Sequence, residues 1–184
     1  MSEDKENLPP VEFKAQGLLA EKGVKITERS SIDALSQRGY GTPEKNLLAL
    51  SFYEALYLAD KQILCVKDKK GAQIDFQSLL QAYEAADKNA WMHYLVYRDL
   101  RSRGYVVREG FGAAIDFRIY ERGTYGKDTA TSLVLSTQEG QPLPMEDLSN
   151  ALTQTQSLKK DLVLAVLNRR GEIVYYSVSP LTFK

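Results

Sequence analysis

Six arginines lie within a short stretch of the second half of this chain of 184 residues. Guanidinium groups bind phosphates and stack on unpaired bases, so this stretch could contact a nucleic acid. Acidic residues are interleaved with them, and ion pairs within a helix or on the surface would use the same charges equally well. The arginines are Arg98, Arg101, Arg103, Arg108, Arg118 and Arg122, of which Arg98, Arg101, Arg118 and Arg122 are the candidates for RNA contact; the interleaved acids are Asp99, Glu109, Asp116 and Glu121.

Cysteine and histidine each occur once, as Cys65 and His93. A structural zinc site needs several such ligands and a Cys/His nucleophile needs a matched pair, so both kinds of site are disfavoured. Only a magnesium site built from carboxylates would remain. The sequence therefore predicts no metal and no other cofactor, and it predicts a structural role for His93.

The composition is that of an ordinary globular protein, with 43% hydrophobic and 26% charged residues. Lys plus Arg and Asp plus Glu both number 24, which excludes a protein that coats nucleic acid by bulk charge. Cys65 lies in the apolar run Ile-Leu-Cys-Val, so we expect it to be buried and reduced. No run approaches the roughly 18 apolar residues that span a bilayer, and the first residues are charged; we expect a cytoplasmic protein with no membrane partner.

The elements that would position these side chains fall into two groups. After a charged tail at 1–10, which we expect to be flexible, the first half predicts a small α+β domain over 11–87. Thr42-Pro43-Glu44 has the pattern of a helix start, and apolar residues then recur at helical spacing as far as Ala59. The other predicted elements of this half are a hairpin over 11–27, a strand over 63–66 and a helix over 75–86. The polar stretch 87–89 is the expected domain boundary.

The second half, 88–184, predicts a mixed sheet flanked by helices. Met92, Val96 and Leu100 share one helical stripe that ends at Gly104. Strands are expected over 105–108, 115–120, 132–136, 162–167 and 173–178, with a helix over 146–156 and a tight turn at 168–171. The fold class is therefore α/β in the broad sense (α+β), with two domains and no internal repeat.

Several segments of the second half closely resemble the archaeal-type tRNA-splicing endonuclease family. The resemblance covers residues 94–110 and the motif Asp-Phe-Arg-Ile-Tyr at 116–120, and it continues through Gln-Ser-Leu-Lys-Lys at 156–160 to Ile-Val-Tyr-Tyr at 173–176. It also reaches back to Gly-Tyr-Gly at 39–41 and to 50–58. The resemblance implies a small N-terminal α+β domain followed by an endonuclease-like domain.

The resemblance also implies an activity, the cutting of intron-bearing precursor tRNA at a bulge-helix-bulge without a catalytic metal. The products would be a 2′,3′-cyclic phosphate and a 5′-hydroxyl. The family uses a Tyr, a His and a Lys for this transfer, which needs a base, an acid and a cation. Tyr120 stands at the tyrosine position and Lys160 at the lysine position.

The histidine of the family is missing. Counting from Tyr120 puts its position at Ala130, whereas alignment on the strand that follows puts it at Thr129. Neither residue donates a proton near pH 7, and His93 lies elsewhere in the sequence. Three explanations stay open: a noncatalytic structural subunit beside a catalytic relative, a catalytic chain whose histidine was replaced by alanine at 130, or a slow nuclease or assembly protein without an RNA role.

Family members assemble as dimers of dimers or as fused chains, partly through the edge of the last strand. The resemblance thus implies precursor tRNA and either a related catalytic subunit or a second copy as partners, and interface candidates at Tyr175 and Tyr176. A second family contact inserts an acidic loop into a basic groove. The matching turn here, Arg169-Arg170-Gly171-Glu172, has the opposite net charge, so Glu172 alone or the acidic stretch 139–147 would have to serve.

Overall fold

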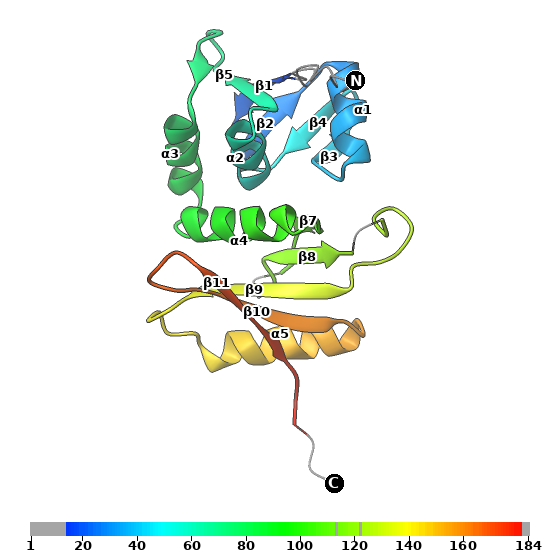
Figure 1. Ribbon diagram of the computed structural model, residues 1–184, viewed down its shortest axis with the longest axis vertical. Helices are drawn as coiled ribbons and strands as arrows, with labels where there is room; N and C mark the ends of the chain where they lie inside the picture. Colours follow the sequence, from blue (N-terminus) through cyan, green and yellow to red (C-terminus); the bar gives the residue numbers. More distant parts are fainter. Residues whose placement is uncertain (1–13, 113, 122, 182–184) are drawn as a thin grey trace, which may run out of the picture.

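The computed structural model describes residues 14–112, 114–121 and 123–181. It confirms the mixed α+β class: two mixed sheets are joined and covered by helices (Figure 1). The expected tail at 1–10 lies outside the described residues, as does the RNA-contact candidate Arg122. No described helix is long and apolar enough to cross a membrane.

The first sheet has the strand order β3-β4-β2-β1-β5-β6, and its only parallel pair in the described chain joins β1 to β5. The elements of this half are β1 (Ala15–Ala20), β2 (Gly23–Ile26), α1 (Arg29–Gln37), β3 (Thr42–Glu44), β4 (Leu47–Leu50), α2 (Phe52–Asp60), β5 (Leu64–Lys67), β6 (Gln73–Ile74) and α3 (Phe76–Ala86). The strand predicted over 63–66 and the helix over 75–86 are thus present. Cys65 is only partly buried, because alternation along β5 puts Leu64 and Val66 into the core; the prediction that it is buried is wrong.

The prediction that a helix starts at Thr42-Pro43-Glu44 is also wrong. That stretch forms the hairpin β3–β4, and Leu48 is buried as a strand residue. The helix begins later, at Phe52, where Ser51 and Glu54 form a capping box: Oε2 of Glu54 accepts from the Ser51 backbone N–H at 3.0 Å. The Ser-x-x-Glu pattern was the better signal for the helix start.

The second sheet has the order β11-β10-β9-β8-β7, with β9 and β10 parallel. Its elements are α4 (Ala90–Ser102), β7 (Val106–Glu109), β8 (Phe117–Tyr120), β9 (Ser132–Gln138), α5 (Met145–Ser157), β10 (Asp161–Leu167) and β11 (Ile173–Val178). All of them match the predicted elements of this half to within a few residues. Helix α4 packs on one face of this sheet and α5 on the other (Figure 1).

One hydrophobic core connects both sheets through α4. It contains Val24 of the first sheet, Tyr97 and Leu95 of α4, and Phe117 and Val134 of the second sheet. A smaller core lies beneath α5 on the far face of the second sheet. Because α4 packs on both halves, it holds the second sheet in position relative to the first sheet.

Candidate functional site

Three strand ends meet at one end of the second sheet, on the right in Figure 1. Tyr120 closes β8, Thr131 precedes β9, and Lys160 precedes β10. The register pairs Ile119 with Ser132 and Ser132 with Asp161, so these three ends are direct neighbours. The Ile119 carbonyl accepts from the Thr131 N–H at 2.8 Å, which joins the first two ends. The topology therefore brings Tyr120, the 129–131 segment and Lys160 together.

Lys160 is positioned by the way helix α5 ends. Its backbone N–H donates to the Thr155 carbonyl at 3.0 Å, and the Lys159 N–H donates to that of Gln156. This is a Schellman ending, and it puts Lys159 into the left-handed region at φ 53°. The partial negative charge of the helix C-terminus favours a cation at this point. The Lys160 Nζ donates to Thr129 Oγ1 at 2.6 Å.

Tyr120 is half-buried and packs against the loop that follows it. Its ring meets that of Tyr125 edge to face, with centroids 5.1 Å apart and an interplanar angle of 89°. Tyr125 in turn lies against Gly39 of the first half, where an added Cβ would come within 3.3 Å of the Tyr125 ring and 2.6 Å of Val106. The loop between β8 and β9 thus rests on the turn that follows α1.

The two candidate positions for the missing histidine differ sharply in the structure. Ala130 is buried, with 7% of its surface exposed. Thr129 is exposed, and its hydroxyl touches the Lys160 ammonium. Only Thr129 therefore presents a side chain to the lysine. This end of the sheet carries a phenol, a hydroxyl and an ammonium group, and its described residues include no imidazole.

Most of the candidate arginines are occupied by contacts within the chain. Arg101 stacks on the Tyr40 ring at 3.8 Å and donates to the Arg38 carbonyl at 3.0 Å. Arg118 Nε donates to the Glu109 carbonyl at 2.8 Å. Arg98 is exposed above the ring of Tyr94, at 5.6 Å, and forms no ion pair among the described residues. Of the candidates that the structure describes, Arg98 is exposed, and its guanidinium contacts the Tyr94 side chain.

Arg108 belongs to a buried ion pair that sequence reasoning missed. Its Nη1 lies 3.2 Å from Glu54 Oε1 and its Nη2 donates to Thr42 Oγ1 at 2.9 Å. Burial raises the pKa of Glu54, although Arg108 and the N–H donors of Ser51 and Gly41 oppose this rise. The pair joins β7 of the second sheet to α2, so this arginine is structural.

The interface candidates lie on β11, an edge strand, and on the turn before it. Tyr176 and Val174 are exposed, whereas the Tyr175 hydroxyl donates to Asp99 Oδ2 at 2.7 Å and is held against α4. In the turn, Arg169 Nε lies 3.8 Å from Glu139 Oε1, so the charge of Arg169 is partly offset. The side chains of Arg169, Arg170 and Glu172 are all exposed at this turn, and Glu172 accepts from Asn168.

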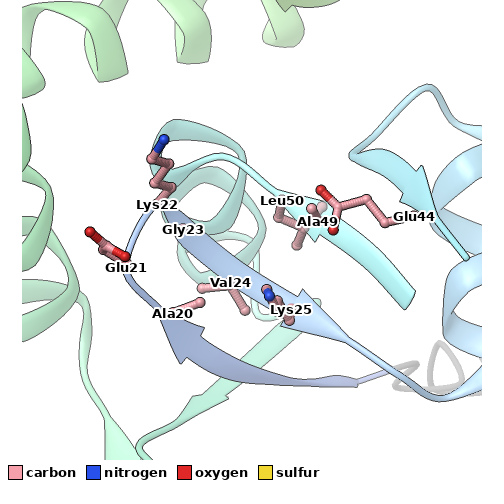
Figure 2. Close-up of a pocket in the computed structure, with 9 residues that line it drawn as sticks. All are labelled: Ala20, Glu21, Lys22, Gly23, Val24, Lys25, Glu44, Ala49 and Leu50. Atoms are coloured by element: carbon pink, nitrogen blue, oxygen red, sulfur yellow. The ribbon is translucent and has the colours of Figure 1, made fainter. Parts of the chain in front are cut away.

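A groove of about 730 Å³ runs beside this turn, over the exposed face of α4. It is lined by the cations Lys61, Arg98 and Arg103, by the acids Asp60, Asp99 and Glu172, and by the apolar Leu95, Ile173 and Val174. A smaller pocket of about 250 Å³ lies beside the β1–β2 turn, with Glu21, Lys22, Lys25 and Glu44 around it (Figure 2). Figure 2 shows it on the first sheet, and it contains none of the predicted site residues.

His93 lies at the other end of the second sheet from Tyr120. Its ring nitrogens face Asp87 and Asp116, and Asp116 immediately precedes β8, whose far end is Tyr120. His93 therefore does not supply the missing imidazole. Within the ranges that the structure describes, no three His, Cys, Asp or Glu side chains are grouped so as to hold a metal ion.

Comparison with known proteins agrees with this geometry. The family model of the tRNA intron endonuclease catalytic C-terminal domain matches residues 90–175, and that of the N-terminal domain matches residues 15–80. A tRNA-splicing endonuclease of Methanococcus vannielii is 34% identical over 163 residues, which cover 89% of this chain and 92% of the relative. One of Pyrococcus horikoshii is 31% identical over 175 residues, 95% of this chain and 98% of the relative. With two domain models matched in order and relatives matched nearly end to end, this chain belongs to the tRNA intron endonuclease family.

Proposed function

We propose that this chain takes part in the excision of introns from precursor tRNA as the noncatalytic, structural subunit of a tRNA-splicing endonuclease. The observation that supports the proposal is the hydrogen bond from Lys160 Nζ to Thr129 Oγ1. It brings the residue at the lysine position of the family next to one of the two candidate positions of the missing histidine, and that position carries a threonine. The family models and the relatives support a role in intron removal. Two domains meeting at residue 87, and a cytoplasmic location, stay predictions.

The proposed reaction shows why one missing group matters. The ribose 2′-OH attacks the adjacent phosphorus at a bulge-helix-bulge, giving a 2′,3′-cyclic phosphate and a 5′-hydroxyl. Tyr120 is suited to receive the 2′-OH proton beside a cation, and Lys160 is suited to neutralise the charge of the phosphorane. The departing 5′-oxygen needs a proton donor, and a threonine hydroxyl does not ionise near neutral pH. Loss of a general acid costs about 10²- to 10⁴-fold in rate.

The surfaces around β11 support an assembly with a related catalytic subunit. The unpaired edge of β11 and the exposed Val174 and Tyr176 offer a strand for pairing with another chain. The groove over α4 lies beside this edge and carries three cations and three acids. The turn of this chain carries Arg169 and Arg170 beside Glu172, so we do not expect it to act as an acidic loop that inserts into the partner.

Cleavage by separate and combined chains tests the role directly. The purified chain is incubated with an intron-bearing precursor tRNA, alone and with a catalytic relative purified from the same cells. We expect no measurable cutting by the chain alone and cutting by the mixture. Native mass spectrometry of the complex from cells should report two chain types; a complex of one chain type that cuts introns would contradict the structural role.

Two histidine substitutions test which position corresponds to the general acid of the family. Thr129→His places an imidazole beside Lys160 and should raise cleavage by the chain alone by about 10²- to 10⁴-fold if the rest of the site is intact. Ala130→His is the matched control, because the side chain at this position is buried, whereas that of Thr129 is exposed and contacts the lysine. Gain of cleavage at 130 and not at 129 would instead favour a catalytic chain whose histidine was replaced by alanine.

A further inference from the structure

The only histidine of the chain is held between two carboxylates from different parts of the fold. His93 Nδ1 lies 2.6 Å from Asp87 Oδ2, and Nε2 lies 3.3 Å from Asp116 Oδ1. Asp87 ends α3, in the connector to α4, and Asp116 precedes β8. Only 16% of the His93 side chain is exposed. The imidazole thus connects three elements at one point.

An acceptor at each ring nitrogen determines the protonation state of His93. A neutral imidazole has one N–H and one lone pair, so it would turn a lone pair toward one of the carboxylates. An imidazolium donates to both. Burial by itself would lower the pKa of His93, but the hydrogen bonds and charges of Asp116 and Asp87 outweigh burial and raise the pKa above its ordinary value of 6.5.

The surrounding groups leave His93 as the cation that faces both acids. The Tyr83 hydroxyl interacts with Asp87, and burial together with the Asp87 charge raises the pKa of Tyr83, so it stays neutral. The Ser136 backbone N–H donates to Asp116 Oδ2 at 2.6 Å. More distant charged groups line two cavities beside the ring: Lys22 and Glu109 a cavity of about 310 Å³, and Lys88 and Asp147 a cavity of about 550 Å³.

We propose that His93 is a pH-dependent latch, which as an imidazolium fastens the α3–α4 connector to the loop before β8 and on deprotonation releases it. Deprotonation removes the positive charge and leaves Asp87 and Asp116 on opposite sides of a neutral ring. The two flanking cavities give the connector and the loop room to separate. The loop before β8 leads along one strand to Tyr120, so release loosens the support of that end of the sheet.

The direction in which stability changes with pH follows from the direction of the pKa shifts of His93 and Asp87. The pKa of His93 is higher in the folded chain, so its contribution to stability is complete below pH 6.5 and is lost as the pH rises through the folded value. The pKa of Asp87 is lowered from 3.8, because its hydrogen bonds with Asn89 and His93 outweigh its burial. Its contribution is present above pH 3.8 and is lost in acid. The latch is therefore closed in weak acid and opens toward alkaline pH.

A proton NMR titration tests the protonation state cleanly, because the chain has one imidazole. We expect its resonances to titrate with a midpoint above pH 6.5 in the folded protein and near 6.5 in concentrated urea. Each pH unit between the two midpoints corresponds to about a tenfold change in the unfolding equilibrium constant. Asp116→Asn and Asp87→Asn should each move the folded midpoint down. A folded midpoint at or below 6.5 overturns the proposal.

Hydrogen exchange then separates a latch from a histidine that merely titrates. Amide exchange of residues 87–93, 110–112 and 114–117, corrected for the intrinsic pH dependence, should accelerate at least fivefold between pH 6 and pH 9 in the natural chain, while that of α5 stays constant. His93→Gln should lack this acceleration. If that variant does not fold, Asp116→Asn, which keeps the imidazole, should show the acceleration at a lower pH. Equal exchange at both pH values in the natural chain would contradict release.

Discussion

Single residues decide what the end of the second sheet can do. Lys160 is placed by the left-handed ending of α5 and touches Thr129, while Ala130 is turned into the protein. The sequence predicted the neighbourhood of Tyr120 and Lys160, but it left Ala130 and Thr129 as alternatives. Counting residues along the sequence does not show whether a side chain is buried or exposed, whereas the structure shows that Ala130 is buried and Thr129 is exposed.

The left-handed residues at two helix ends give a prediction at this scale. Lys159 and Gln62 have φ angles of 53° and 60°, and each follows a helix in the position that glycine favours. We expect Lys159→Gly and Gln62→Gly each to raise the free energy of unfolding by about 0.5 to 1 kcal/mol, because the steric strain of the side chain is removed. Urea denaturation measures this difference.

Lys61→Gly is the matched control for these two variants. Lys61 has φ −78° at the end of α2, so glycine relieves no strain there and should lower stability. A loss of stability in both Lys159→Gly and Gln62→Gly, equal to that of the control, would show that the helix endings are not strained.

At the scale of elements, periodic segments were predictable and short ones were not. Helices α3, α4 and α5 were predicted because their apolar residues recur over three turns or more. The hairpin β3–β4 was missed because Thr42-Pro43-Glu44 resembles a helix start and Leu48 fits the stripe of α2. Helix α1 was not predicted, since it buries only Ser31 and Leu35. Residues 47–50 form the strand β4 because they pair with β2, which is distant in sequence.

The edge strand β11 gives the prediction at this scale. Val174→Lys together with Tyr176→Lys puts two charges on the exposed face of this strand and should weaken association through its edge. Native mass spectrometry should show a shift from the assembled form toward single chains, with little change in folding. Ser177→Lys, which points to the other face, should leave the assembly unchanged; an assembly unaffected by the double change would exclude β11 as the interface.

At the scale of the whole molecule, α4 and one buried ion pair hold the two halves together. The core through α4 was not predictable as a shared core, because apolar spacing shows which face is buried but not what covers it. The Arg108–Glu54 pair was hidden for the same reason, since 53 residues separate its members in the chain. Arg101 and Arg108, from the arginine-rich stretch, also contact the first half of the chain. Contact of Arg101 with RNA stays a prediction.

Breaking the buried pair should be costly for the whole chain. Arg108→Ala leaves the Glu54 carboxylate buried without its cation, so we expect the free energy of unfolding to fall by about 3 to 5 kcal/mol. Arg29→Ala, which breaks the exposed pair with Asp33, should cost less than about 1 kcal/mol. Urea denaturation of the two variants compares them. Equal losses would mean that the Arg108 pair contributes no more to stability than an exposed pair.

The central claim is that this chain lacks the proton donor for RNA cleavage and acts beside a chain that has one. The most direct measurement is the single-turnover rate at which the purified chain alone cuts an intron-bearing precursor tRNA, compared with its Thr129→His variant. The account predicts no measurable cutting by the natural chain and a gain of about 10²- to 10⁴-fold in the variant. Efficient cutting by the natural chain alone would contradict it.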